Sequence, residues 1–156
     1  MSSRRFKPQL SGRHHLEFFP APKQPDLRPF AAIVIPWVDF DHVLLCQIEN
    51  RGWVVPSGRL EPNESSREAA LREVQEEAKA TLKGLTYIGC YRISHQDTKR
   101  WADLYSAKVK GLGAFEPSKE SIARKVVNLD ELPGMYYLWN ELLAEIFAYS
   151  REVTFR

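Results

Sequence analysis

The amino-acid sequence predicts one mixed α/β (α+β) domain in which a mixed β-sheet is sandwiched between helices. The composition fits a folded globular protein, because charged residues make up 27% and hydrophobic residues 44% of the 156 residues. Stretches rich in β-branched and aromatic residues lie on both sides of a segment with helical periodicity. A second segment of helical periodicity lies near the end of the chain.

Residues 1–28 are expected to form an extended basic leader, and residues 29–156 are expected to form the domain. Four prolines interrupt the leader, and no regular hydrophobic period runs through it. Its basic residues outnumber its acidic ones; they are Arg4, Arg5, Lys7, Arg13, Lys23 and Arg28. We prefer a solvated segment that lies over the domain to an arm that binds a polyanion.

The domain is expected to begin with two neighbouring strands at residues 30–37 and 42–48. Both stretches are apolar or β-branched, and a short polar connection joins them. A third apolar stretch at residues 53–55 precedes a Pro-Ser-Gly sequence. This sequence is a turn signal, so we expect it to open a polar loop.

A helix is expected from Ser65 to Ala80. Ser65 and Glu68 stand at the spacing of a capping box, in which each side chain accepts a hydrogen bond from a backbone N–H of the first turn. Apolar residues at helical spacing are expected to pack inward; they are Ala70, Leu71, Val74 and Ala78. The glutamates of this helix then lie on a different side.

The rest of the chain is expected to form a hairpin, one more strand and a final helix. The hairpin strands are placed at residues 85–93 and 101–109, with a polar loop at residues 94–100 between them. The next strand is expected at residues 122–129. Apolar residues at helical spacing predict the final helix at residues 137–149.

The composition argues against several classes of protein. Every apolar stretch is far shorter than the roughly 20 residues of a membrane-spanning helix, and the N-terminus lacks the apolar core of a secretory signal. A net charge of +2 is too small to favour nucleic acid as the main ligand. Cys46 and Cys90 are expected to be reduced thiols of a cytoplasmic protein, with a disulfide between them left open.

The glutamates of the first helix are the residues most suited to carry chemistry. Glu73 and Glu77 stand one turn apart with Glu76 beside them, so three carboxylates can converge. Like charges at this spacing destabilise a helix by roughly 0.2–0.5 kcal/mol per pair. A divalent cation would remove the repulsion, and Mg²⁺ or Mn²⁺ accepts such oxygen ligands, particularly beside a substrate phosphate. The alternative is an ordinary solvated helix face.

The residues around these glutamates resemble the signature of the Nudix hydrolase family. The family pattern runs Gly, five residues, Glu, seven residues, then Arg-Glu-aliphatic-any-Glu-Glu-any-Gly-aliphatic. The stretch from Gly58 to Ala80 follows this Nudix box; its matching residues are Gly58, Glu64, Arg72, Glu73, Val74, Glu76 and Glu77. Lys79 replaces the second glycine of the pattern. A lysine at positive φ would be strained by about 1 kcal/mol at this helix exit.

The resemblance implies hydrolysis of a pyrophosphate linkage in a nucleoside diphosphate joined to another group. Glu73, Glu76 and Glu77 would bind Mg²⁺ or Mn²⁺, and one of them can instead act through water. The metals would neutralise phosphate oxygens, orient a water and lower its pKa, so that a glutamate takes its proton.

The resemblance also implies roles for other residues of the Nudix box. Gly58 matches the position whose backbone carbonyl can join the metal shell, and Glu64 is expected to be a supporting or water-mediated ligand. Arg72 is expected to pair with a glutamate and fix its rotamer. Family members often recruit a further carboxylate from a distant loop, for which Glu120 is the first candidate and Glu116 the second.

The nucleotide substrate is left open by the sequence. Aromatic side chains suited to stacking on a base are available, although most aromatics in strands belong to the core; they are Phe40, Trp53, Tyr91, Trp101 and Tyr105. The markers of Nudix enzymes that cut ADP-ribose, dinucleoside polyphosphates or NADH are not visible. A nucleoside triphosphate, including an oxidised one, is the default, and a nucleotide sugar is next.

Two other functions remain as alternatives. A catalytically silent module could keep this fold to sense a nucleotide or hold a partner, although the complete set of glutamates favours an enzyme. An RNA-end-processing enzyme would use the basic leader, and a salt-sensitive affinity for RNA would identify it. Homodimers are common in families of this kind, and the sequence does not settle the oligomeric state.

Overall fold

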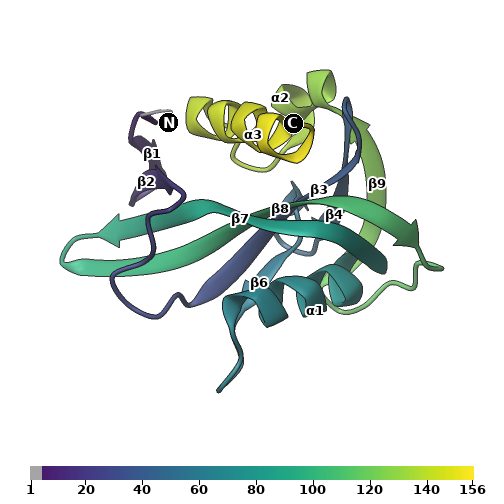
Figure 1. The fold of residues 1–156 in the computed structure, drawn as a ribbon, viewed down its shortest axis with the longest axis horizontal. Coiled ribbons are helices and arrows are strands. Elements are labelled where there is room, and N and C mark those ends of the chain that lie inside the picture. The colour runs from purple at the N-terminus through teal and green to yellow at the C-terminus, as the bar shows by residue number, and fades with distance from the viewer. Residues whose placement is uncertain (1–4) are drawn as a thin grey trace.

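The computed structural model describes residues 5–156, which form one nine-stranded sheet with helices on both faces (Figure 1). The strands are β1 (Gln9–Ser11), β2 (His14–Pro20), β3 (Ala31–Asp39), β4 (His42–Ile48), β5 (Gly52–Val54), β6 (Ser57–Arg59), β7 (Ala80–His95), β8 (Thr98–Leu112) and β9 (Ser121–Asn128). The helices are α1 (Ser66–Ala78), the 3₁₀ turn η1 (Leu129–Glu131), α2 (Leu132–Met135) and α3 (Glu141–Thr154).

The sheet is mixed, as the sequence predicts. Its order is β1-β2-β7-β8-β3-β4-β5, while β6 pairs with β3 and β9 pairs with β4. β3 and β8 are parallel, and the other pairs are antiparallel. The predicted class, a mixed sheet between helices, is therefore confirmed.

The helices bury both faces of the central strands. On one face α1 packs Ala70, Val74 and Ala78 against β3 and β4. On the other face α3 packs Ile146 and Phe147 into the larger core cluster. Burial on both faces explains why β3 and β4 are nearly continuous apolar runs without polar alternation.

One residue of the inward face of α1 differs from the prediction. Leu71 is 44% exposed, whereas Ala69 is fully buried and contributes to the core in its place. The buried stripe is therefore narrow and made mostly of alanine. Small side chains let α1 lie close to the sheet, which brings the glutamates of the helix close to β6.

The N-terminal segment is not the solvated leader expected for residues 1–28. Residues 1–4, including Arg4, lie outside the described part of the chain. Within residues 5–28, β1 and β2 form a hairpin at the edge of the sheet, where β2 pairs with β7. Phe18 is only 4% exposed, and its ring meets Phe6 edge-on with 4.8 Å between centroids. Leu16 and Phe18 occupy alternate positions of β2 and supply the apolar side that the core covers.

Two further elements differ in extent from the prediction. The long loop expected at residues 94–100 is mostly strand, because β7 and β8 pair as far as His95 and Thr98. The final helix begins later, at Glu141, because the side chain of Asn140 caps it and accepts a hydrogen bond from the N–H of Leu143 at 2.9 Å. Among residues 5–156 no helix is long and apolar enough to cross a membrane.

The packing of the N-terminal hairpin is tested by Phe18→Ala. Truncating a buried phenylalanine removes apolar contacts and leaves a cavity, so we expect the free energy of unfolding to fall by about 3–5 kcal/mol in urea denaturation. Leu10→Ala in the same hairpin is the control, because Leu10 is 68% exposed and its loss should change stability by less than about 0.5 kcal/mol. Equal effects of the two substitutions would contradict this packing.

Candidate active site

A cleft of about 530 Å³ lies between α1, β6 and the loop before β9. We call it the carboxylate cleft. Five of its lining residues are glutamates, namely Glu61, Glu73, Glu76, Glu77 and Glu120. Three arginines, Arg51, Arg59 and Arg72, also line it. The structure therefore gathers most of the site residues predicted from the sequence around one opening.

The ends of α1 fix the position of its glutamates. Ser65 caps the helix through the predicted capping box with Glu68. At the other end Lys79 adopts a left-handed conformation with φ 52°, as a family glycine would, and its N–H donates to Gln75 O at 3.1 Å. The predicted strain at Lys79 is thus present, and the helix still ends at the position that the Nudix box requires.

Glu73 and Glu77 are buried carboxylates, with 8% and 6% of their surface exposed. Burial raises the pKa of Glu77 to about 7, although the N–H of Ser57 donates to its Oε1 at 2.8 Å and opposes the shift. Burial also raises the pKa of Glu73, and Arg72 opposes that shift. Burial therefore disfavours the negatively charged form of both carboxylates.

Arg72 donates hydrogen bonds to three glutamates. Its Nε and Nη2 donate to the two carboxylate oxygens of Glu64 at 2.7 and 2.8 Å, and its Nη1 donates to Glu73 at 2.7 Å and to Glu76 at 3.2 Å. This is the pairing predicted for Arg72, and the pairing with Glu64 has bidentate geometry. Both oxygens of Glu64 are therefore engaged with Arg72.

The backbone of β6 runs directly against the glutamates. A Cβ added to Gly58 would overlap the Glu73 carboxylate, so only glycine allows this approach. Gly58 also lines the carboxylate cleft together with Glu73 and Glu77. Gly58 therefore belongs to the same small region as the carboxylates.

Glu120 reaches the carboxylate cleft from the loop before β9. Its carbonyl accepts a hydrogen bond from the N–H of Glu49 at 2.8 Å, and the next residue, Ser121, donates its hydroxyl to Glu77 O at 2.6 Å. These bonds tie this part of the chain both to Glu49, directly after β4, and to the end of α1. Glu116, the second candidate, is exposed and does not line the cleft.

The donor set suits a hard divalent cation. Glu73, Glu76 and Glu77 each keep one carboxylate oxygen free of the hydrogen bonds described above. No group of three or more His, Cys, Asp or Glu side chains within residues 5–156 stands close enough together to hold an ion unaided. Oxygen ligands that leave several coordination positions for water and phosphate are typical of Mg²⁺ sites.

Two of the arginines were not predicted as site residues. Arg51 is an exposed residue between β4 and β5, and Arg59 ends β6; both line the carboxylate cleft. Arginines at an opening full of carboxylates can contact the phosphates of an incoming ligand. Arg51 lies outside the Nudix box, and Arg59 stands at one of its unspecified positions, so the pattern singles out neither residue.

Comparisons with known proteins agree with this fold and identify the family. The family model of the NUDIX domain matches residues 27–149. The chain belongs to the Nudix family. YtkD of Bacillus subtilis (strain 168), a candidate 8-oxo-dGTP diphosphatase, is 41% identical over 69 residues. That match covers 44% of this chain and 44% of YtkD, so the chain spans less than half the length of this relative.

Solved structures of similar fold extend the likeness beyond the family match. The crystal structure of a mutant of the Bacillus subtilis pyrophosphohydrolase BsRppH has a TM-score of 0.82 at 22% identity, and covers 96% of this chain and 98% of that chain. A NUDIX hydrolase from Nitrosomonas europaea has a TM-score of 0.65 at 21% identity, and covers 80% of this chain and 89% of its own. These likenesses concern the fold.

The role of Glu64 as the partner of Arg72 is tested by acid unfolding. Arg72 holds the pKa of Glu64 at about 2, below its ordinary value of 4.5. A lowered folded-state pKa means that the pair stabilises the fold above about pH 4.5 and that this stabilisation is lost as the pH falls towards 2. In Glu64→Gln we therefore expect the melting temperature, followed by circular dichroism, to fall less steeply over this window than in the unmodified protein.

Glu61→Gln is the matched control for Glu64→Gln. The Glu61 side chain is 64% exposed and lies 3.7 Å from Arg72, so its ion pair is solvent-screened and should contribute little. The pH dependence of the melting temperature of Glu61→Gln should match that of the unmodified protein. If Glu64→Gln and the unmodified protein lose stability in parallel between pH 4.5 and 2, Glu64 does not anchor Arg72.

Proposed function

We propose that this chain is a Nudix pyrophosphohydrolase that cuts a nucleoside diphosphate derivative, foremost a nucleoside triphosphate, with Mg²⁺ or Mn²⁺ in the carboxylate cleft. The observation that carries the proposal is the burial of Glu73 and Glu77 at a cleft that three further glutamates line. Such a cleft repels a bare polyphosphate. A substrate of that charge can enter only together with cations.

The proposed chemistry divides the work among the residues of the cleft. A bound divalent cation would neutralise phosphate oxygens and lower the pKa of the attacking water. Glu73, Glu76 and Glu77 would hold it with their free oxygens, together with the Gly58 carbonyl. Arg72 keeps Glu73 and Glu76 in fixed rotamers.

The remaining residues of the cleft have positioning and charge roles. Glu64 fixes Arg72 rather than serving as a direct ligand, since both its oxygens are engaged. Glu120 adds a carboxylate from the loop before β9, where it can take a proton from water or complete the metal shell. Arg51 and Arg59 would contact phosphate oxygens.

Two of the basic residues of the N-terminal segment bind within the chain, which favours small nucleotides over RNA ends as substrates. Lys23 pairs with Asp26 at 2.7 Å, and Arg28 donates to the carbonyls of Glu61 and Glu64 at 3.0 and 2.9 Å. These residues are engaged within the chain. The names of the similar proteins, a candidate 8-oxo-dGTP diphosphatase and a pyrophosphohydrolase, support phosphate-chain cleavage without fixing the base. A cytoplasmic location remains a prediction.

The proposal predicts that Glu77→Gln loses activity while the fold persists. With Mg²⁺ or Mn²⁺ and a panel of nucleoside triphosphates and nucleotide sugars, release of mononucleotide should fall about 100-fold or more, because a charged oxygen is lost from the cleft. The melting temperature should not fall, because glutamine removes a buried charge and can still accept the hydrogen bond from Ser57. Liquid chromatography of the products measures the activity.

Gln75→Ala is the control, since Gln75 is exposed on the same helix and should keep full activity. Turnover that survives in Glu77→Gln would rule out the proposed site. Nucleotide binding by the unmodified protein without any turnover, under all metals and substrates, would instead support the catalytically silent module.

A further inference from the structure

The loop between β6 and α1, residues 60–65, carries Glu64 of the Nudix box. Residues 61–63 are exposed, so few apolar contacts hold this loop in place. Two hydrogen bonds close it internally: the N–H of Glu64 donates to Glu61 O at 3.0 Å, and the N–H of Glu61 donates to Glu64 Oε1 at 2.9 Å. Such a loop opens locally at a low free-energy cost unless other parts of the chain restrain it.

Arg28 restrains the loop from outside. Its Nη2 donates to the carbonyls of Glu61 and Glu64 at 3.0 and 2.9 Å. Two residues further along the chain, Phe30 O accepts a hydrogen bond from the N–H of Leu60 at 3.0 Å. In Figure 1 the segment between β2 and β3, which contains Arg28, enters β3 close to the start of α1. The N-terminal segment therefore binds both the beginning and the end of the loop.

The loop is connected to the carboxylate cleft through Glu64. Both carboxylate oxygens of Glu64 accept hydrogen bonds from Arg72, and Arg72 also donates to Glu73 and Glu76. A shift of the loop would therefore move the guanidinium that fixes these two carboxylates. Arg28 itself does not line the cleft, so it can act on the cleft only through the loop.

We propose that Arg28 is a positioning residue for the hydrolysis: it holds the loop at residues 60–65 so that Glu64 and Arg72 keep the cleft glutamates in the arrangement that receives a divalent cation. This inference rests on the function proposed above. It gives the N-terminal segment, which lies outside the Nudix box, a part in building the site.

Two other roles for Arg28 agree less well with its contacts. Binding of a substrate phosphate requires a guanidinium at the cleft, whereas the Nη2 of Arg28 is engaged with two carbonyls of the loop. A large contribution to global stability requires burial, whereas Arg28 is exposed and exposed charged groups contribute little. Local opening of a loop costs little free energy, so two hydrogen bonds are enough to change how often it opens.

Arg28→Met tests the local effect without metal or substrate. Methionine keeps an unbranched apolar stem and removes the donors to both carbonyls. In the ¹⁵N-labelled full-length protein, NMR should show the amide protons of Glu61 and Glu64 exchanging with water at least about fivefold faster, because the loop opens more often. Exchange in the central strand β4 should stay unchanged, and so should the melting temperature.

The same substitution tests the effect on the cleft. The dissociation constant of Mn²⁺ without nucleotide, measured by electron paramagnetic resonance of the free ion, should rise about fivefold or more, because Glu73 and Glu76 lose their fixed rotamers. In hydrolysis at saturating Mn²⁺, kcat should fall while KM stays the same, because Arg28 does not contact the substrate. Arg28→Lys should recover most of the Mn²⁺ affinity, since an ammonium can donate to the same two carbonyls.

Lys23→Met is the matched control, because it removes an equal charge from the same segment. The ammonium of Lys23 pairs with Asp26 at 2.7 Å and lies over the Trp101 ring, so amide exchange of the loop and Mn²⁺ affinity should match those of the unmodified protein.

Unchanged exchange of the Glu61 and Glu64 amides in Arg28→Met would overturn the proposal. A higher KM with unchanged Mn²⁺ affinity would also overturn it, since Arg28 would then bind the substrate directly. The exchange measurement needs neither metal nor turnover. It therefore tests Arg28 independently of the Glu77 experiment, and either inference can fail without the other.

Discussion

Two glutamates of α1, Glu73 and Glu77, are buried where their negative charge is disfavoured, and the structure around them makes that charge tolerable. Arg72 binds Glu73, the backbone N–H of Ser57 binds Glu77, and Gly58 leaves room for both carboxylates. Burying carboxylates is unfavourable unless cations or donors compensate. This constraint accounts for the glycine turn, the arginine and the spacing of the Nudix box.

The sheet supports this arrangement from both ends of α1. The first turn is attached to β8, because the hydroxyl of Ser66 donates to Asp103 at 2.6 Å, and burial raises the pKa of Asp103. At the far end Arg124 of β9 donates to the carbonyls of Ala78 and Lys79 at 2.9 and 3.3 Å, which stabilises the negative end of the helix. The helix is thereby fixed between two strands, and its carboxylates stay in register with Gly58.

Local patterns predicted much of the fold and of the candidate site. The capping box and the pairing of Arg72 follow from short-range spacing, which the sequence displays directly, whereas the helix ends at Ala78 and not at the predicted Ala80. The position of Glu120 beside the cleft could be predicted only from the resemblance to the family, whose members often recruit a further carboxylate from a distant loop. The N-terminal hairpin was missed because its prolines hide the alternation of Leu16 and Phe18, and because its pairing with β7 joins residues far apart in the chain. Arg51 was missed for the same non-local reason.

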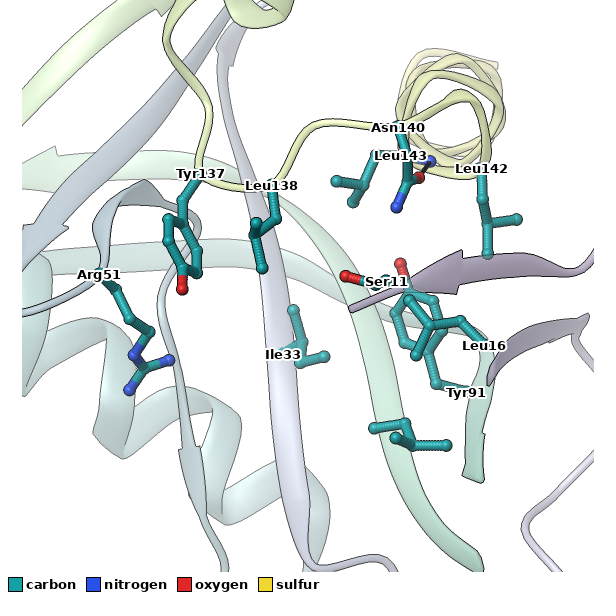
Figure 2. A pocket seen from close by; sticks show the side chains of 11 residues that line it. Ser11, Leu16, Ile33, Arg51, Tyr91, Tyr137, Leu138, Asn140, Leu142 and Leu143 are labelled. Carbon is teal, nitrogen blue, oxygen red and sulfur yellow. Dashed lines mark hydrogen bonds between the residues drawn. The ribbon is translucent and has the colours of Figure 1, made fainter. Parts of the chain in front are cut away.

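Arg51 connects the N-terminal hairpin with the Nudix box. It lines the carboxylate cleft and also a neighbouring cavity of about 310 Å³ (Figure 2), whose wall includes Ser11 and Leu16 of the hairpin.

Binding of manganese is the most direct measurement of whether the α1 carboxylates hold a cation. Crystals grown with Mn²⁺ and a non-hydrolysable nucleoside triphosphate analogue should show anomalous scattering within coordination distance, about 2.0–2.3 Å, of oxygens of Glu73 and Glu77. The Gly58 carbonyl should lie in the same shell. Full occupancy of the analogue with no anomalous peak at these carboxylates, at millimolar Mn²⁺, would contradict the proposed role of the cleft.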